Sequence, residues 1–172
     1  MLKIYLKDSD VPRLADERIR IVREETPREP CDNEDLVFER VFDESEIPTN
    51  ALFMWDFQPV GKDRMFFFTT ELRCKEFVSP KPEDWTFDKL KKFAEEEKKL
   101  YRDWDQCCVY GWIQEKWNPA QRKWDTVSST YGYYGAEALL AELKDKTVPV
   151  CIDSEDLKYD FDNTEKKVNE LE

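Results

Sequence analysis

Carboxylates are the residues of this sequence with the most evident capacity for chemistry. The chain has 39 aspartates and glutamates against 27 lysines and arginines, for a net charge of −12. Closely spaced carboxylates can bind Mg²⁺ or act as a general acid and base. Two tight groups occur, one made of Asp32, Glu34 and Asp35 and one of Asp153, Glu155 and Asp156. Neither group has the loop glycine of an EF-hand. A chain with 39 acids is also expected to contain such groups by chance. A carboxylate-dependent, metal-assisted hydrolase or nuclease is therefore an alternative function only.

Other catalytic chemistries are excluded by composition. The chain contains no histidine, which removes the commonest general base, the Ser-His and Cys-His nucleophile pairs and most catalytic zinc sites. Its four glycines are too scattered for a phosphate-binding loop. The adjacent Cys107 and Cys108 would point to opposite faces of a strand, which favours a buried structural role. We therefore predict a protein that is not an enzyme and has no catalytic residue, metal site or cofactor.

The distribution of charge predicts the kind of partner. Residues 1–52 carry 14 acids and 8 bases, residues 53–152 carry 17 and 16, and residues 153–172 carry 8 and 3. This charge disfavours direct binding of nucleic acid and favours a basic protein surface. The acids are either solvated surface or a contact surface. The contact acids that we predict are Glu34, Asp35, Asp43, Glu44, Glu46, Glu155, Asp156 and Asp160.

An aromatic hairpin is predicted between residues 104 and 135. Four of the six tryptophans lie there, in two β segments on either side of an Asn118-Pro119 turn. Aromatic platforms on sheets can stack nucleic-acid bases, but only three basic residues lie near this turn, so a packed scaffold is favoured. Trp117 and Trp124 flank the turn and are predicted as apolar anchors for a protein partner.

The elements that must position these residues indicate an α+β fold. Alternating or aromatic runs predict strands at 1–7, 18–23, 51–58, 64–72, 106–114, 124–134 and 147–152. Helical spacing predicts one main helix at 87–102 and a short one at 136–143. We expect an antiparallel sheet of about five or six strands with the main helix packed on it. One domain should cover residues 1–152, followed by a weakly ordered acidic tail at 153–172.

The cellular setting is predicted to be the cytoplasm. No apolar run approaches the roughly 20 residues of a membrane helix, and the first residues lack the pattern of a secretory signal. An odd number of cysteines, five, without a CxxC motif favours reduced thiols. No membrane partner is expected, and the sequence does not indicate whether the protein self-associates.

Three short motifs resemble a family of small proteins encoded by phages and integrated mobile elements of Gram-positive bacteria. They are Pro27-Arg28-Glu29 with Asp32-Asn33, then Val109-Tyr110-Gly111-Trp112 after Tyr101-Arg102-Asp103, and finally 131–135 (YGYYG), which is similar to the WGFYG of the family. The family has a histidine-containing stretch after its DN motif, whereas residues 34–42 contain none here. No role of those histidines can be carried over.

The resemblance implies a genomic setting and, through it, a function. Small acidic phage proteins are often inhibitors of host defence, including anti-CRISPR and antirestriction proteins, some of which present carboxylates in place of phosphates. We therefore expect a non-enzymatic phage or mobile-element protein that acts in the host cytoplasm. Its expected partner is the basic surface of a host defence nuclease or nucleic-acid-binding protein. A structural or assembly component of a phage is a further alternative.

Overall fold

The computed structural model describes residues 4–5, 16–33, 35–152, 157 and 160–161. Its contacts group into two compact units, one made of residues 1–27 and 107–172, the other of residues 28–106. We call them the hairpin unit and the helical unit. The α+β class and the single main helix are confirmed. The expected sheet of five or six strands is divided, however, into a five-stranded and a three-stranded sheet, and the single domain predicted for residues 1–152 corresponds to two separately packed units.

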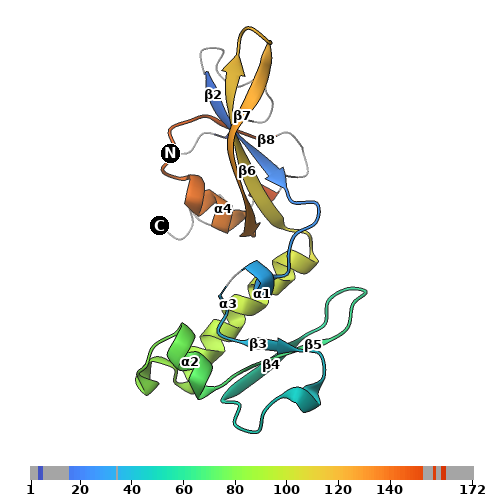
Figure 1. Cartoon of the computed structure of the whole chain (residues 1–172), viewed down its shortest axis with the longest axis vertical. Coiled ribbons are helices and arrows are strands. Elements are labelled where there is room, and N and C mark those ends of the chain that lie inside the picture. The colour runs from blue at the N-terminus through green and yellow to red at the C-terminus, as the bar shows by residue number, and fades with distance from the viewer. Residues whose placement is uncertain (1–3, 6–15, 34, 153–156, 158–159, 162–172) are drawn as a thin grey trace. The chain divides into compact units, whose positions relative to one another are not determined.

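The sheet of the hairpin unit has the strand order β1-β8-β2-β6-β7, and β2, β6, β7 and β8 are labelled in Figure 1. Its strands are β1 (Ile4–Tyr5), β2 (Glu17–Arg23), β6 (Val109–Asn118), β7 (Lys123–Tyr134) and β8 (Val150–Ile152). β6 pairs antiparallel with β2 and β7, whereas β8 runs parallel to β1 and β2. The sheet is therefore mixed, because helix α4 (Ala136–Leu143) carries the chain from β7 across two strands to β8.

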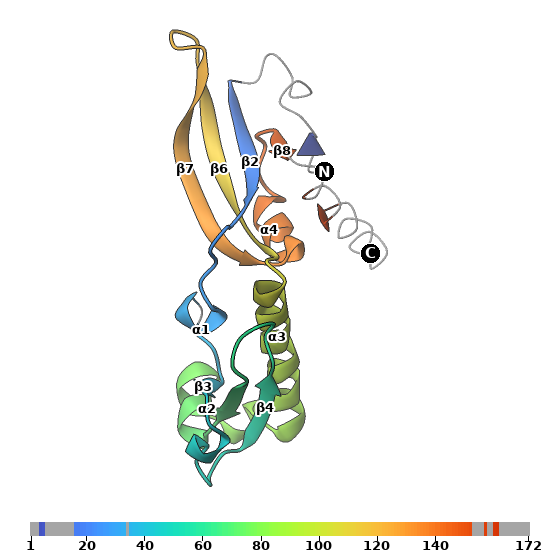
Figure 2. The same ribbon diagram turned by 90° about the vertical axis from the view of Figure 1, so that its right-hand side faces the viewer.

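Helix α4 packs beside this sheet and closes its core (Figure 2). Side chains from β2, β6 and β8 meet Leu139 and Leu143 of the helix in one buried cluster. Leu157 and Phe161 belong to the same cluster, so part of the predicted acidic tail contributes to the core. Asp160 is also described, and the remaining residues of that tail lie outside the described part of the chain.

Gly111 in β6 is required by a close approach of β7. A β-bulge interrupts the pairing there, and the ring of Tyr131 lies over the glycine. A Cβ atom at position 111 would stand 2.6 Å from the carbonyl oxygen of Thr130, a distance that real side chains do not adopt. Gly111 and Tyr131, which belong to two of the three motifs described above, thus pack against each other, and only glycine leaves room for this contact.

The cysteine pair does not lie in a strand as predicted. Cys107 has the left-handed backbone angle φ 56° and is exposed, and β6 begins only at Val109. Cys107 lies two residues after Asp105, the last residue of the main helix, at a position where a left-handed residue commonly reverses the chain. The predicted buried role is therefore wrong for Cys107, while Cys108 is half-buried.

The helical unit joins a three-stranded antiparallel sheet to three α-helices. The strand order is β3-β5-β4, with β3 (Glu39–Val41), β4 (Phe53–Phe57) and β5 (Met65–Thr69). The helices are α1 (Pro30–Asn33), α2 (Glu71–Phe77) and α3 (Phe87–Asp105), and two 3₁₀ turns, η2 (Glu44–Glu46) and η3 (Pro82–Asp84), complete the unit. None of the described helices has the length and apolar composition of a membrane span.

Helix α2 was not predicted. The run at 64–72 was expected to be one strand, but the strand ends at Thr69. Thr70 then caps a helix, because its hydroxyl accepts a hydrogen bond from the backbone N–H of Arg73 at 3.4 Å. Thr70 follows Phe68 and Thr69, and all three residue types favour strands, so the sequence pattern alone does not show that Thr70 begins a helix.

Aromatic packing forms the core of the helical unit. Trp55 of β4 stacks on Phe67 of β5 with ring centroids 3.8 Å apart. Tyr101 of α3 meets both rings edge-on, at 5.9 and 4.6 Å. The main helix therefore lies on one face of the small sheet, which we call the inner face.

Candidate partner-binding surface

The predicted contact residues are distributed over both units. Asp35, Asp43, Glu44 and Glu46 belong to the helical unit, whereas Trp117, Trp124 and Asp160 belong to the hairpin unit. Glu34, Glu155 and Asp156 lie outside the described residues. Each unit therefore carries its own group of predicted contact residues.

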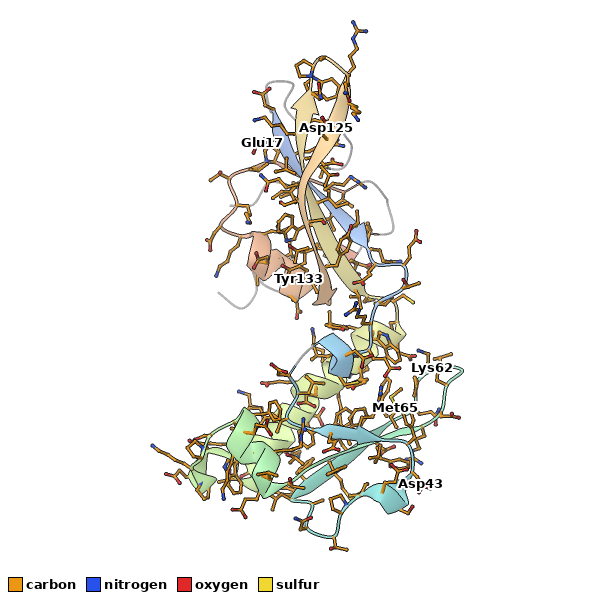
Figure 3. All side chains as sticks on the ribbon, in the orientation of Figure 1. Glu17, Asp43, Lys62, Met65, Asp125 and Tyr133 are labelled. Carbon is orange, nitrogen blue, oxygen red and sulfur yellow. The ribbon has the colours of Figure 1, made fainter. Side chains whose placement is uncertain are left out.

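Three of the acids form one exposed turn directly after β3. We call Asp43, Glu44 and Glu46 the acidic turn; Asp43 is labelled in Figure 3. The Asp43 carboxylate accepts a hydrogen bond from the backbone N–H of Ser45 at 2.9 Å, and this bond lowers the pKa of Asp43. All three side chains are exposed, and none has an ion pair with a residue in the described part of the chain. The turn thus presents three exposed carboxylates within four residues of the chain.

An exposed aromatic residue adjoins the acidic turn. Phe42 is 54% exposed and carries the guanidinium of Arg40 over its ring at 4.9 Å. Arg40 is in turn paired with Glu29. A charged turn beside an accessible aromatic ring matches the composition of protein-binding surfaces, where aromatic anchors are surrounded by polar groups.

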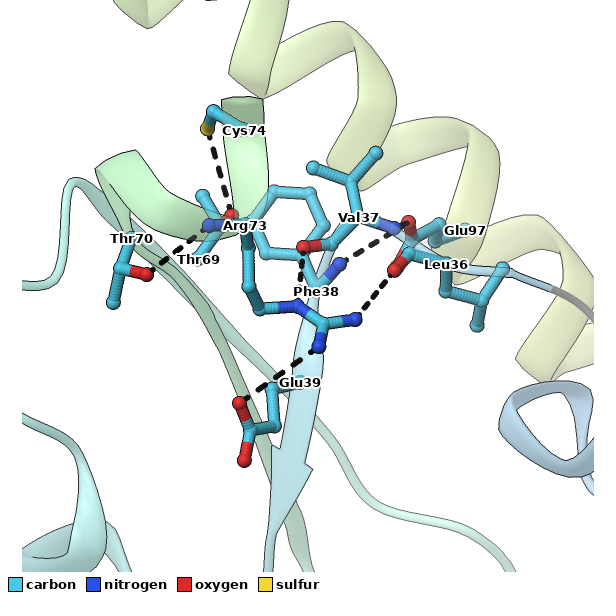
Figure 4. A network of polar contacts seen from close by, with 9 residues as sticks. All are labelled: Leu36, Val37, Phe38, Glu39, Thr69, Thr70, Arg73, Cys74 and Glu97. Carbon is cyan, nitrogen blue, oxygen red and sulfur yellow. Dashed lines mark hydrogen bonds and ion pairs between the residues drawn. The ribbon is translucent and has the colours of Figure 1, made fainter. Parts of the chain in front are cut away.

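The chain leading into β3 is held on both sides by charged side chains (Figure 4). Glu97 of α3 accepts hydrogen bonds from the backbone N–H groups of Val37 and Phe38, at 2.7 and 3.4 Å. Arg73 of α2 donates to the carbonyl oxygens of Leu36 and Val37, at 2.7 and 3.1 Å. We call this arrangement the Glu97–Arg73 clamp. It anchors residues 36–38 and so fixes the strand from which the acidic turn projects.

The carboxyl of Glu97 in the clamp has a strongly raised pKa. Burial raises its pKa from 4.5 to about 7, and the two backbone N–H groups and the nearby Arg73 oppose that shift only partly. Its second carboxylate oxygen is buried without a hydrogen bond to any described residue. The group is therefore close to half-protonated at neutral pH.

A cavity of about 260 Å³ lies next to the clamp. Its lining is Cys31, Asp35, Leu36, Phe38, Glu39, Arg40, Arg73 and Phe77. Asp35, another predicted contact acid, stands exposed at this cavity. Burial raises the pKa of the Cys31 thiol, which lowers its thiolate fraction and makes it a poor nucleophile at neutral pH. Arg40 is paired with Glu29, and Arg73 is bonded to the clamped backbone. Both cationic side chains of the lining are therefore already engaged within the unit.

The turn of the hairpin unit exposes one of the two predicted tryptophans. Trp117 is 37% exposed, whereas Trp124 is half-buried, with the guanidinium of Arg18 over its ring at 4.3 Å. The two rings meet edge-on at 5.5 Å. Of the two predicted anchors, Trp117 is therefore the more accessible, and Trp124 packs against it.

Asp160 is engaged inside the hairpin unit. Its carboxylate accepts hydrogen bonds from the Arg23 guanidinium and the Tyr110 hydroxyl, both at 2.7 Å. Burial first and then this bond to Asp160 raise the pKa of Tyr110. Asp160 thus has an internal role in joining two distant parts of the chain, which leaves it less available to a partner.

Sequence reasoning missed the clamp and a buried ion pair. Glu97 stands on the apolar stripe of α3, three residues after Ala94 and four before Tyr101, and this position is the signal that could have identified it. Glu115 in β6 accepts from the guanidinium of Arg18 at 2.7 Å, with both side chains more than nine-tenths buried. Nothing in the local pattern of either strand indicated that pairing.

Comparisons with known proteins add no relative. No protein-family model matches the chain, and no match was found among the curated proteins or the solved structures. Within the described residues, no group of three or more cysteine or carboxylate side chains is arranged to hold a metal ion.

Proposed function

We propose that this protein is a non-enzymatic acidic binding protein of phage or mobile-element origin. Its partner would be a host defence nuclease or another nucleic-acid-binding complex. It would inhibit that partner by occupying a basic surface, as an inhibitor of the anti-CRISPR or antirestriction type. The observation that carries the proposal is the acidic turn, with three exposed carboxylates beside an accessible phenylalanine. Fixed carboxylates can compete with phosphates for such a surface, by charge mimicry of nucleic acid.

The Glu97–Arg73 clamp supports this proposal. A charged surface binds more tightly when its backbone is ordered beforehand, because less conformational entropy is lost on association. The clamp holds residues 36–38 by four hydrogen bonds from two helices. The acidic turn begins five residues after this anchored segment, at the end of β3.

The test is a triple charge reversal. A partner would first be captured from a host lysate with the tagged protein and then purified. Asp43→Lys, Glu44→Lys and Glu46→Lys together should weaken binding by at least about 100-fold at low salt, because close charge pairs across interfaces contribute a few kcal/mol. The slope of affinity against salt concentration should also become shallower.

A matched control separates the turn from net charge. Glu71→Lys, Glu83→Lys and Glu96→Lys change the charge of the same unit equally, at three other exposed positions. This control should retain most of the affinity. Equal losses in the two triple variants would show that the turn is not the contact, and no loss in either would refute the proposal.

A further inference from the structure

The three-stranded sheet has a second face, opposite α3, on which apolar side chains lie next to one another. The register pairs Met54 with Phe68, and Phe66 with both Val41 and Asp56. Directly paired residues share a face, and these alternate with Trp55 and Phe67, which contact α3. We call Val41, Met54, Phe66 and Phe68 the outer face.

The outer face is accessible mainly at its β4 edge. Met54 is 48% exposed and Val41 and Phe66 are half-buried, whereas Phe68 is buried and forms the floor between them. Phe66 also carries the guanidinium of Arg64 over its ring at 5.5 Å. Exposed apolar side chains that adjoin in this way are typical of an interaction surface.

Charge identifies the occupant. Two acidic residues border the outer face: Glu39 is paired with Phe68, and Asp56 is paired with Phe66. The acidic turn follows directly after Val41 and Phe42. Arg64 neutralises Asp56, and the one ion pair of Glu39 within the described residues is a long one, 3.9 Å from Arg73. An apolar centre with an acidic border is complementary to a partner that combines aliphatic side chains with arginine or lysine.

A second copy of this chain is a poor occupant. The helical unit carries 20 acids and 13 bases, so two copies placed face to face would repel each other. We propose that the outer face binds a basic segment of a partner protein, in which arginine or lysine alternates with aliphatic residues. This proposal rests on the proposed function and adds to it the apolar half of the interface.

Methionine methyl groups offer a direct test. Met54 lies on the outer face, and Met65, which is buried on the inner face, is an internal control. The full chain, labelled with ¹³C-methyl methionine, would be titrated with a synthetic peptide in which arginine and leucine alternate. The Met54 resonance should shift to saturation while that of Met65 stays in place, and a peptide with serine in place of leucine should bind more weakly.

Substitutions make the test quantitative. Met54→Lys should weaken binding of the arginine-leucine peptide by about tenfold or more, the size of effect found for interface anchors. Leu72→Lys, at a 74% exposed position on α2, adds the same charge away from the outer face and should leave affinity unchanged. Circular dichroism of both variants checks that the fold is retained.

Three results would overturn the inference. They are a Met54 resonance that does not respond to the peptide, equal affinities of the two lysine variants, or a Met54 shift that depends on protein concentration alone, which would mean that a second copy binds there. The proposed function fails separately. The proposed function is refuted if charge reversal of the acidic turn leaves partner affinity unchanged. It is retained, and only the outer-face inference is refuted, if that reversal weakens partner binding while Met54→Lys does not.

Discussion

The buried carboxyl of Glu97 makes the stability of this protein depend on pH. Its pKa is raised in the folded state, so folding favours the protonated form. The stabilising contribution is therefore complete below the unfolded value of 4.5 and is lost as the pH rises through about 7. The charged groups around it are Arg73 of α2 and Glu96 of its own helix.

Glu97→Gln should remove this dependence. The amide retains an oxygen that can accept from Val37 and Phe38, but it cannot ionise. Between pH 4.5 and pH 7 the free energy of unfolding of the wild type should fall relative to that of the variant, by up to about 3 kcal/mol. Urea unfolding at a series of pH values measures this difference.

Glu96→Gln is the matched control, because Glu96 is the exposed neighbour of Glu97 on the same helix. Its stability should still fall as the pH rises, by slightly less than that of the wild type, because the Glu96 charge adds a little to the raised pKa of Glu97. Parallel profiles for wild type, Glu96→Gln and Glu97→Gln would contradict a buried, proton-binding Glu97.

At the scale of elements, the clamp joins three parts of the helical unit. Arg73 of α2 and Glu97 of α3 hold the same backbone segment in front of β3. β3 has only three residues and lies at an edge of its sheet. A strand this short has few ladder hydrogen bonds of its own, so its position depends on the clamp.

Arg73→Met tests that dependence. Two carbonyl oxygens, those of Leu36 and Val37, would lose their donor, which should cost about 1–3 kcal/mol of stability. Amide hydrogen exchange should accelerate in residues 37–41 above all. Lys75→Met on the same helix removes only an exposed ion pair with Glu71 and should change stability by less than about 1 kcal/mol. Unchanged exchange in β3 would show that the clamp does not hold the strand.

At the scale of the whole molecule, the helical unit is a continuous segment with its own core. Residues 28–106 contain the stacked Trp55 and Phe67, the edge-on Tyr101 and the clamp. The cluster of the hairpin unit draws only on residues before 28 and after 106. Each core is therefore complete within its unit.

We expect residues 28–106 to fold alone. Expressed as a fragment, the unit should unfold cooperatively and retain the near-ultraviolet signal of its packed aromatic residues, because these contacts are internal. Thermal unfolding followed at two wavelengths measures this. The same fragment with Trp55→Ala, which should lose about 3–5 kcal/mol, is the control for a specific core. A fragment without a cooperative transition would mean that the unit needs the rest of the chain.

Local signals in the sequence were sufficient for the α+β class, the main helix and most strands. Helical spacing predicts α3 from Phe87, and the observed helix begins there and runs three residues beyond the predicted end. Alternation and an Asn118 turn predict the β6–β7 hairpin, in which Asn118 accepts from the N–H groups of Ala120 and Gln121. These features depend on neighbours in sequence, which explains why they could be predicted.

Tertiary structure alone decided the division into two sheets, the parallel place of β8, the clamp and the outer face. Each depends on contacts between residues far apart in the chain, such as Glu97 with Val37 or Phe66 with Val41, and local periodicity carries no information about which distant strands meet. The sequence by itself determined that the chain is acidic, lacks histidine and places carboxylates at 43, 44 and 46. Folding decided that these three carboxylates share one exposed turn beside an apolar sheet face, because β3 ends where they begin.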